Sequence, residues 1–467
     1  MKIAILGAAG VRTPLILQAM FARQDRIGLD ELSLMDIDAK RLELMAAITA
    51  PLEKSGRLRF QITRTTAAEM ALEAADFVIT TFRVGGIASR VVDERVPLQL
   101  GFLGQETTGA GGFAMGMRTI PVILEYVEQM RQHCPQAWLI NFANPAGMLA
   151  EAVVQASGWD RVVGICDAPS EMGRAAAALL GARVKDMYLD YFGLNHLGWL
   201  RAALYEGEDR LPWFLEWIQQ AGGLPGLPFT PEFLITLGMI PNEYLYYYYH
   251  NSKAVKNILA AGKTRGEQIT ELNDRLFEDL RGLKTSSGGR LEAISPEQTS
   301  ALYQTYLQAR GQTYMRAETG SLRNLENLDP ESARALAEVF ASEGYAGVAL
   351  DLIEALTGSQ PGTMILNIPN QGAIQGMGAQ DVVEIPAYVA RETIRPLSVG
   401  KVPLQCLGLM QQVKAYEHLT IQAAVEGSYN LAIQALTVHP LVRDVDSAKA
   451  ILDGYIQGHG AIFPVLN

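Results

Sequence analysis

Lys2-Ile3-Ala4-Ile5-Leu6 leads directly into Gly7-Ala8-Ala9-Gly10-Val11-Arg12-Thr13, and a second apolar run, Leu32-Ser33-Leu34-Met35, ends on Asp36. The order strand, glycine turn, helix, strand and terminal carboxylate is that of a dinucleotide-binding βαβ unit. Glycines let the backbone approach a pyrophosphate, the helix N-terminus stabilises its charge, and the acid can bind ribose hydroxyls. The sequence therefore predicts a nucleotide cofactor that contacts the following residues: Gly7, Gly10, Val11, Arg12 and Asp36.

The spacing of the glycines leaves a second interpretation open. The turn reads Gly-x-x-Gly and not the full Gly-x-Gly-x-x-Gly fingerprint, and a glycine turn alone can be only a tight connection between a strand and a helix. The position of the turn, the apolar runs on both sides of it and Asp36 favour cofactor binding.

Composition narrows the class of protein. The chain has 467 residues, of which 49% are hydrophobic, so it can bury a large core and divide into two or three domains. Its net charge of −11 argues against nucleic acid or an anionic membrane surface as the main partner. No signal-like segment precedes the first apolar run, and no apolar run reaches the roughly 18 to 20 residues of a membrane span. We expect a cytoplasmic protein, and its three cysteines, Cys134, Cys166 and Cys406, cannot form a disulfide framework.

Strand-like and helix-like segments alternate up to about residue 185. The strand-like runs after Asp36 are residues 58–62, 76–80, 137–141 and 161–165. This alternation is typical of an α/β fold with a Rossmann-like, doubly wound parallel sheet. Residues 186–204 are extended and the remainder is mainly helical, so we expect a nucleotide-binding domain over 1–185 and a mixed α+β substrate, metal and oligomerisation domain over 186–467. We interpret Tyr246–Tyr249 as the aromatic face of a core helix.

Polar residues gather where these strands end, which is where such sheets bind ligands. Thr80-Thr81-Phe82-Arg83, Asn141-Phe142-Ala143-Asn144 and Cys166-Asp167 follow three of the runs, and His196 comes 30 residues after Cys166. A thiolate and a neutral imidazole suit Mn²⁺, Fe²⁺, Co²⁺ or Zn²⁺. The spacing alone is a weak signal, because such residues are more often a small buried thiol and a hydrogen-bonded core histidine.

Seven ordered segments point to a known family. They are residues 83–90, 93–98, 104–113, 141–147, 164–169, 193–199 and 240–245. On these segments the chain resembles glycoside hydrolase family four, the NAD- and metal-dependent glycosidases, and within it the 6-phospho-β-glucosidases, over essentially its full length. The N-terminal half of that family is in turn similar to lactate and malate dehydrogenases.

The resemblance implies a mechanism outside the usual two-carboxylate scheme. NAD⁺ takes a hydride from C3 of the sugar, a base removes the acidified C2 proton, the C1–O bond eliminates, water adds, and the hydride returns. Cys166 and His196 match the metal ligands, for Mn²⁺ or another divalent ion such as Fe²⁺, Co²⁺ or Ni²⁺. Tyr244 matches the C2 base and Asp167 a general acid. Arg90, Asn144 and Arg265 match substrate-binding positions, and Glu106 and Arg83 are further candidates, beside the substrate and the cofactor respectively.

One residue departs from the pattern of the β-specific branch. Many β-specific members have Asn after the metal-binding Cys, whereas Asp167 is more typical of the α-specific relatives. We expect a 6-phospho-β-glucosidase that acts on a phosphorylated glycoside as a homodimer or homotetramer. The alternatives are a 6-phospho-α-glucosidase, a glycosidase of unphosphorylated sugars, a 2-hydroxy acid dehydrogenase and a catalytically silent NADH-binding sensor.

Overall fold

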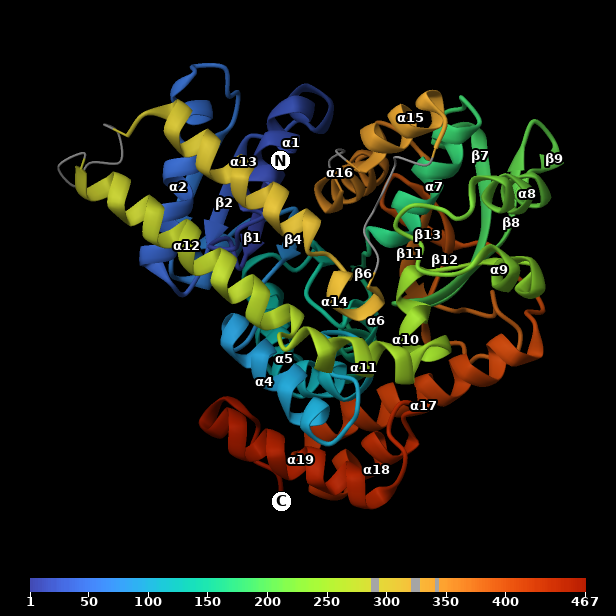
Figure 1. Ribbon diagram of the computed structural model, residues 1–467. Helices are drawn as coiled ribbons and strands as arrows, with labels where there is room; N and C mark the ends of the chain where they lie inside the picture. The colour runs from blue at the N-terminus through green and yellow to red at the C-terminus, as the bar shows by residue number, and fades with distance from the viewer. Residues whose placement is uncertain (287–293, 321–327, 341–343) are drawn as a thin grey trace.

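The computed structural model describes residues 1–286, 294–320, 328–340 and 344–467, which build around one large sheet (Figure 1). Its nine strands lie in the order β13-β12-β11-β6-β5-β4-β1-β2-β3. The first six strands along the chain are parallel, and they are β1 (Lys2–Leu6), β2 (Glu31–Met35), β3 (Gln61–Thr65), β4 (Phe77–Thr80), β5 (Trp138–Asn141) and β6 (Val162–Gly164). Chain order reverses between β1 and β4, which creates the crevice where doubly wound sheets bind ligands. The predicted Rossmann-like fold is confirmed.

The third strand was predicted over residues 58–62 and instead runs from Gln61 to Thr65. Gln61 pairs with Glu31, the first residue of β2, so residues 58–60 precede the first position at which a partner strand exists. The apolar run predicted a strand, but the length of the neighbouring strand decided where pairing begins.

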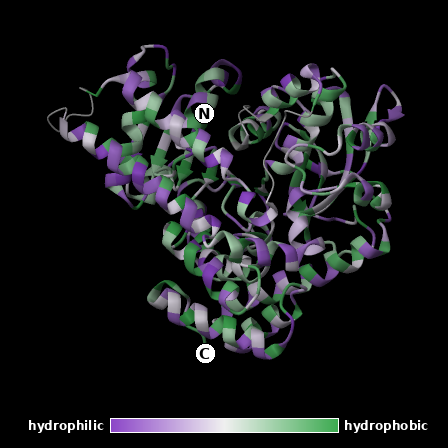
Figure 2. Ribbon diagram, viewed as in Figure 1, coloured by the Kyte–Doolittle hydropathy of each residue, from purple (hydrophilic) through white to green (hydrophobic). Residues whose placement is uncertain are grey.

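Helices connect and cover the parallel strands. They are α1 (Thr13–Ile27), α2 (Ala39–Lys54), α3 (Ala68–Leu72), α4 (Gly86–Gln99), α5 (Gly109–His133), α6 (Ala146–Ala152) and α7 (Ala168–Leu179). Figure 2 shows hydrophobic and hydrophilic residues alternating along the helices that surround the sheet. That alternation is the pattern of helices that bury one face and expose the other.

The second half of the chain adds three strands to the same sheet. These are β11 (Gly362–Pro369), β12 (Val382–Ala390) and β13 (Thr393–Pro396), and β11 joins β6 in antiparallel fashion, with Asn367 opposite Gly164. The boundary predicted near residue 185 falls between α7 and β7 (Met187–Leu194), yet the sheet draws strands from both sides of it.

A smaller sheet and a set of helices complete the fold. The small sheet contains β7, β8 (Leu197–Tyr205), β9 (Glu208–Asp209) and β10 (Ile240–Pro241). The helices are α8 (Leu211–Ala221), α9 (Pro231–Leu237), α10 (Tyr246–Tyr249), α11 (Asn251–Ala261), α12 (Arg265–Ser286), α13 (Pro296–Gln312), α14 (Arg316–Thr319), α15 (Pro330–Phe340), α16 (Tyr345–Leu356), α17 (Leu404–Glu426), α18 (Tyr429–Val438) and α19 (Val445–His459).

The helix pair α12–α13 runs beside the first βαβ unit, with α12 packed on α4 and α13 on α2 (Figure 1). In α10, Tyr246 and Tyr247 are buried and the next two tyrosines are partly buried, as the aromatic-core interpretation predicted. None of the helices within the described ranges is both long and apolar enough to cross a membrane.

Candidate active site

The turn after β1 requires its first glycine. Gly7 has φ +95°, and a Cβ atom on it would lie 2.4 Å from the backbone nitrogen of Phe82. At Gly10 a Cβ atom would approach only the carbonyl oxygen of Gly7, at 3.4 Å. Packing within the chain therefore explains Gly7, whereas it does not demand a glycine at position 10.

Asp36 closes this turn from the end of β2. Its Oδ2 accepts a hydrogen bond from the Ala9 N–H at 2.9 Å, and its Oδ1 accepts one from the Asp38 N–H at 3.0 Å. A carboxylate oxygen can accept a second hydrogen bond, so the group can also receive ribose hydroxyls. The hydroxyl of Tyr303 donates to the Val11 carbonyl oxygen at 2.7 Å, which fixes α13 against the turn. The acid, the glycine turn and the helix N-terminus fit a dinucleotide.

His196 is a buried imidazole without a protein partner. It lies in the two-residue turn between β7 and β8, has φ +63° and is 2% exposed. Neither ring nitrogen has a hydrogen-bond partner within the described part of the chain. Burial lowers the pKa of His196 to about 3, against the opposing charge of Glu106, so the ring is neutral. A neutral, unpartnered imidazole is the form that binds a divalent metal ion.

Cys166 follows β6 and is buried as well, with 4% exposed. Burial raises the pKa of the Cys166 thiol well above its usual range, and the charges of Glu384 and Asp167 raise it further. A bound cation reverses this effect, because a coordinated thiol loses its proton. The donor set of thiol and neutral imidazole therefore fits the expected divalent metal.

Tyr244 covers the His196 ring. It lies in the single turn Glu243–Leu245, and its ring stacks on that of His196 with centroids 3.6 Å apart and planes 9° from parallel. The hydroxyl of Tyr314 donates to the Tyr244 oxygen at 2.6 Å. The predicted base thus lies directly beside the predicted metal ligand, and the Tyr314 hydroxyl forms a hydrogen bond with its phenolic oxygen.

Arg83, Arg90 and Glu106 form one ion-pair cluster. Glu106 Oε2 accepts from Arg90 Nη1 at 2.8 Å and from Arg83, and Arg90 Nε also pairs with Glu94 at 2.7 Å. Burial alone would raise the pKa of Glu106, but Arg90 and Arg83 hold it well below its usual range. Glu106 therefore remains ionised and orients both arginines at the edge of the site.

Arg265, the first residue of α12, lies beside a second guanidinium. It donates to Thr313 Oγ1 and to the Arg310 carbonyl oxygen, the latter at 3.0 Å. Burial, Arg310 and Arg90 lower the pKa of Arg265 to about 10, and burial with the nearby Arg12 lowers the pKa of Arg310. No carboxylate of the described residues lies within ion-pair distance of Arg265 or Arg310. Guanidinium groups that burial makes costly and that no carboxylate pairs directly are typical of an anion site.

The remaining predicted residues lie around this centre. Asn144 is partly buried after β5, immediately before a cis peptide bond to Pro145. Asp167 precedes α7, and its Oδ2 is 4.0 Å from Arg12 Nη1. Arg12 thus reaches from the glycine turn toward the segment that carries Cys166.

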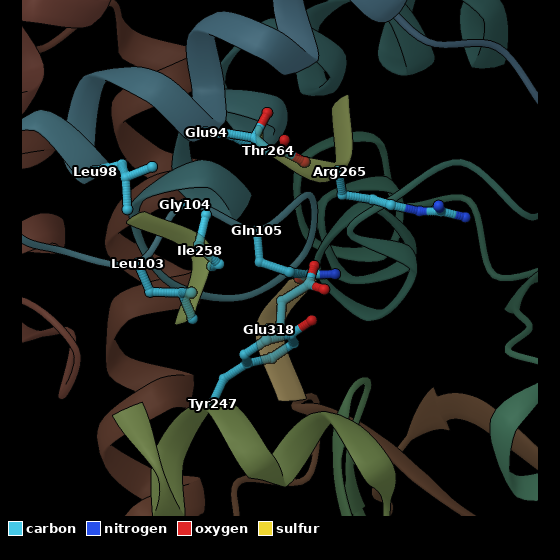
Figure 3. A pocket seen from close by; sticks show the side chains of 10 residues that line it. All are labelled: Glu94, Leu98, Leu103, Gly104, Gln105, Tyr247, Ile258, Thr264, Arg265 and Glu318. Atoms are coloured by element: carbon cyan, nitrogen blue, oxygen red, sulfur yellow. The ribbon is translucent and has the colours of Figure 1, made fainter. Parts of the chain in front are cut away.

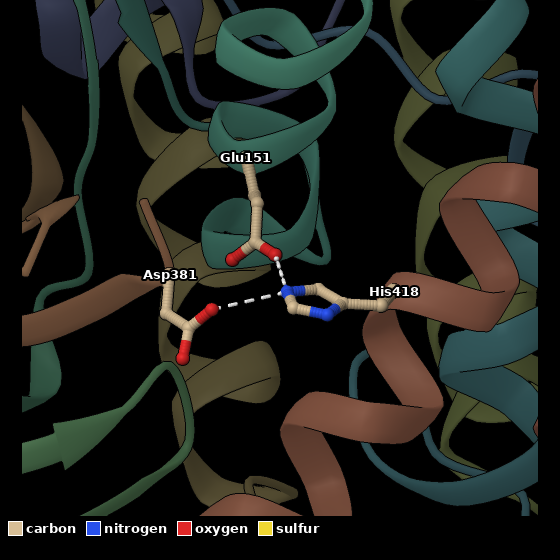
Figure 4. Close-up of side chains that lie close together, drawn as sticks. All are labelled: Glu151, Asp381 and His418. Atoms are coloured by element: carbon tan, nitrogen blue, oxygen red, sulfur yellow. Dashed lines mark ion pairs between the residues drawn. The ribbon is translucent and has the colours of Figure 1, made fainter. Parts of the chain in front are cut away.

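A separate cluster of Glu151, Asp381 and His418 has the spacing of a metal site (Figure 4). His418 Nε2 lies 2.7 Å from Glu151 Oε1 and 3.2 Å from Asp381 Oδ1, and Lys414 Nζ lies 2.6 Å from Glu151 Oε2. Hydrogen bonds to Asp381 and Glu151 raise the pKa of His418 to about 9. Lys414 pairs with Glu151, and His418 lies between Glu151 and Asp381, so the cluster forms an internal ion-pair network.

A small cavity lies behind Arg265, and Figure 3 shows the Arg265 side chain extending away from the other lining residues. Glu94, Gln105, Tyr247 and Glu318 supply most of its polar lining. About 10 Å³ is accessible to the centre of a water molecule, which is space for about one water and not for a sugar.

Sequence reasoning missed three side chains that the fold brings to the site. Tyr314 contacts Tyr244, Arg310 lies beside Arg265, and Glu384 of β12 lies behind the Cys166 segment. All three lie outside the seven segments that pointed to the family, and no local pattern marks them.

Comparison with known proteins decides the family. The family model described as "Family 4 glycosyl hydrolase" matches residues 2–181, and the model described as "Family 4 glycosyl hydrolase C-terminal domain" matches residues 191–442. The chain belongs to the family 4 glycosyl hydrolases. The two matched ranges of this family 4 enzyme lie on either side of the predicted boundary at residue 185.

Its relatives include both anomeric classes. The enzyme is 31% identical to a probable 6-phospho-β-glucosidase of Bacillus subtilis, over 99% of this chain and 97% of the relative. It is 30% identical to a 6-phospho-α-glucosidase of Leptotrichia buccalis, over 100% of this chain and 99% of the relative. A 6-phospho-β-glucosidase structure from Thermotoga maritima, determined with manganese, NAD⁺ and glucose-6-phosphate, superimposes with a TM-score of 0.81 at 28% identity and full coverage of both chains.

Proposed function

We propose that this family 4 enzyme hydrolyses 6-phospho-β-glucosides with NAD and a divalent metal ion, preferably Mn²⁺. The observation that carries the proposal is the buried, neutral and unpartnered His196 ring, stacked on Tyr244 at 3.6 Å. The probable 6-phospho-β-glucosidase of Bacillus subtilis and the manganese, NAD⁺ and glucose-6-phosphate in the Thermotoga maritima structure support the same assignment.

The metal site is assigned to Cys166 and His196. When bound there, the ion would polarise the sugar oxygens at C2 and C3, and NAD would accept the C3 hydride and later return it. Both protein ligands are buried, which excludes water from the reacting carbons and strengthens each electrostatic contact.

Tyr244 is assigned as the base that takes the C2 proton. Its oxygen accepts a hydrogen bond from the Tyr314 hydroxyl at 2.6 Å. Such a hydrogen bond stabilises the phenolate more than the neutral phenol. Asp167 is assigned to the leaving oxygen, to which a protonated carboxyl can give a proton. Asn144 and Arg90 lie around the same centre and are assigned to the sugar.

Arg265 and Arg310 are assigned to the 6-phosphate. A buried and a partly buried guanidinium group, neither in an ion pair with a carboxylate of the described residues, present donors in the fork geometry that binds phosphate oxygens. Glu106 has a different role, because its own charge is already shared between Arg83 and Arg90. It orients those arginines and does not compete for the phosphate.

A 6-phospho-α-glucosidase is the second candidate, favoured by Asp167 and by a relative that is 30% identical. Paired α- and β-linked aryl glucosides, each with and without the 6-phosphate, separate the two in the presence of NAD⁺, Mn²⁺ and reductant. We expect cleavage of the β-linked phosphorylated substrate, deuterium at C2 of the sugar released in heavy water, and no net NADH. Stoichiometric NADH without cleavage would contradict the proposal.

We further propose a cytoplasmic homodimer or homotetramer with a domain division near residue 185. Exposed apolar side chains of α17, α19 and the C-terminal segment support association, and they include Leu404, Val425, Val445 and Val465. Light scattering on the purified enzyme measures the oligomeric state.

A further inference from the structure

Glu384 is a buried carboxylate that the assignments above leave without a role. It lies on β12, is 1% exposed, and accepts hydrogen bonds from Tyr191 Oη at 2.9 Å, Asn367 Nδ2 at 2.9 Å and Asn195 Nδ2 at 3.4 Å. No cationic side chain of the described residues forms an ion pair with it. Three hydrogen bonds, without an ion pair, therefore offset only part of the cost of burying this group.

The donor Asn195 connects Glu384 to His196. Asn195 directly precedes His196 in the β7–β8 turn, and its Oδ1 accepts from the Ala146 N–H at 3.1 Å. One amide thus connects Glu384 to the turn that presents the imidazole and to the loop that contains Asn144. Because the imidazole has no hydrogen bond of its own, the conformation of this turn and the Tyr244 ring set its orientation.

The donors Tyr191 and Asn367 connect Glu384 to the other parts of the site. The Tyr191 hydroxyl also accepts from Asn242 Nδ2 at 3.4 Å, and Asn242 Oδ1 accepts from the Tyr244 N–H at 3.0 Å. Asn367 lies opposite Gly164 in the sheet. Gly164 precedes Cys166 by two residues in the chain. The side chain of Glu384 therefore joins the segments that carry Cys166, His196, Tyr244 and Asn144.

We propose that Glu384 is a positioning residue that sets the arrangement of the metal ligands and of the Tyr244 base. The proposal rests on the assignment of Cys166 and His196 to the metal. Three donors converge on the two carboxylate oxygens, and a glutamine there would present its own N–H₂ group to at least one of them. That mismatch displaces the segment behind the mismatched donor without changing any residue that touches the metal or the sugar.

Glu384→Gln tests the role, with Mn²⁺ affinity of the whole enzyme measured by electron paramagnetic resonance and NAD⁺ affinity by calorimetry. We expect Mn²⁺ binding to weaken by about 10- to 100-fold, the range typical of groups that orient metal ligands, with NAD⁺ affinity within about twofold. Tyr191→Phe deletes one donor and keeps the ring, so it should weaken Mn²⁺ binding by less and gives a second measurement if Glu384→Gln does not fold.

Glu354→Gln is the matched control, since Glu354 is also a buried carboxylate but pairs with Arg23 and Arg26 on α1. It should lower the melting temperature and leave Mn²⁺ affinity unchanged. Folded Glu384→Gln and Tyr191→Phe proteins with wild-type Mn²⁺ affinity would overturn the positioning role alone. A wild-type enzyme that binds no Mn²⁺ would overturn the proposed function as well.

Discussion

Removing the Tyr314 hydroxyl tests the chemistry of the site most directly. Tyr314→Phe keeps the ring and deletes the 2.6 Å hydrogen bond to the Tyr244 oxygen. A hydrogen bond to a charged group contributes about 1.5–3 kcal/mol, and each 1.4 kcal/mol is a factor of ten in rate. Since the bond stabilises the phenolate, kcat should fall by about 10- to 150-fold, with KM nearly unchanged.

The assay is cleavage of a 6-phosphorylated aryl β-glucoside with and without deuterium at C2. In Tyr314→Phe the C2 isotope effect should increase, because proton removal becomes more rate-limiting, and a higher pH should restore part of the rate. Tyr429→Phe is the matched control, since it loses a 2.8 Å hydrogen bond to Asp453 far from the site. A Tyr314→Phe enzyme with the wild-type rate and isotope effect would refute the inference that the Tyr314 hydroxyl stabilises the Tyr244 phenolate during proton removal.

Three further predictions concern the metal, the phosphate and pH. Cys166→Ser should abolish Mn²⁺-dependent turnover and keep the melting temperature within a few degrees, as thermal unfolding and Mn²⁺ titration would show. Arg310→Gln should raise KM about 10- to 100-fold for the 6-phosphorylated substrate only, so an equal change for the unphosphorylated glucoside would contradict the phosphate assignment. The folded-state pKa of His418, raised to about 9, predicts stability that is fully present below the unfolded pKa near 6.5 and is lost as pH rises through about 9. His418→Gln should remove this pH dependence, on the order of 1 kcal/mol after discounting for its partial exposure, and an unchanged unfolding profile between pH 6 and 10 would contradict it.

The features predicted from the sequence are those that neighbouring residues determine. The glycine turn, Asp36 at the end of β2 and the motifs that carry Cys166 and His196 are each encoded within a few residues, so pattern and resemblance find them. The β3 shift arose because pairing depends on where β2 begins, which a single run of sequence does not contain.

The residues that sequence reasoning missed owe their positions to long-range packing. Tyr314 and Arg310 reach the site because α13 lies against the glycine turn through Tyr303, almost 300 residues away in the chain. Glu384 reaches it because β12, together with β11 and β13, joins a sheet whose other six strands come from the N-terminal half. No local periodicity records these pairings, since they depend on how the two halves of the chain meet.

The shared sheet also decides how this enzyme can be divided. A fragment that ends near residue 185 would leave β6 as an edge strand, with the backbone groups that β11 covers exposed to other chains. Such an edge recruits foreign strands, so the N-terminal fragment expressed alone should aggregate although it contains the complete cofactor turn. The same interleaving denies the two halves a free hinge between them, because they could separate only by breaking the pairing of β6 with β11.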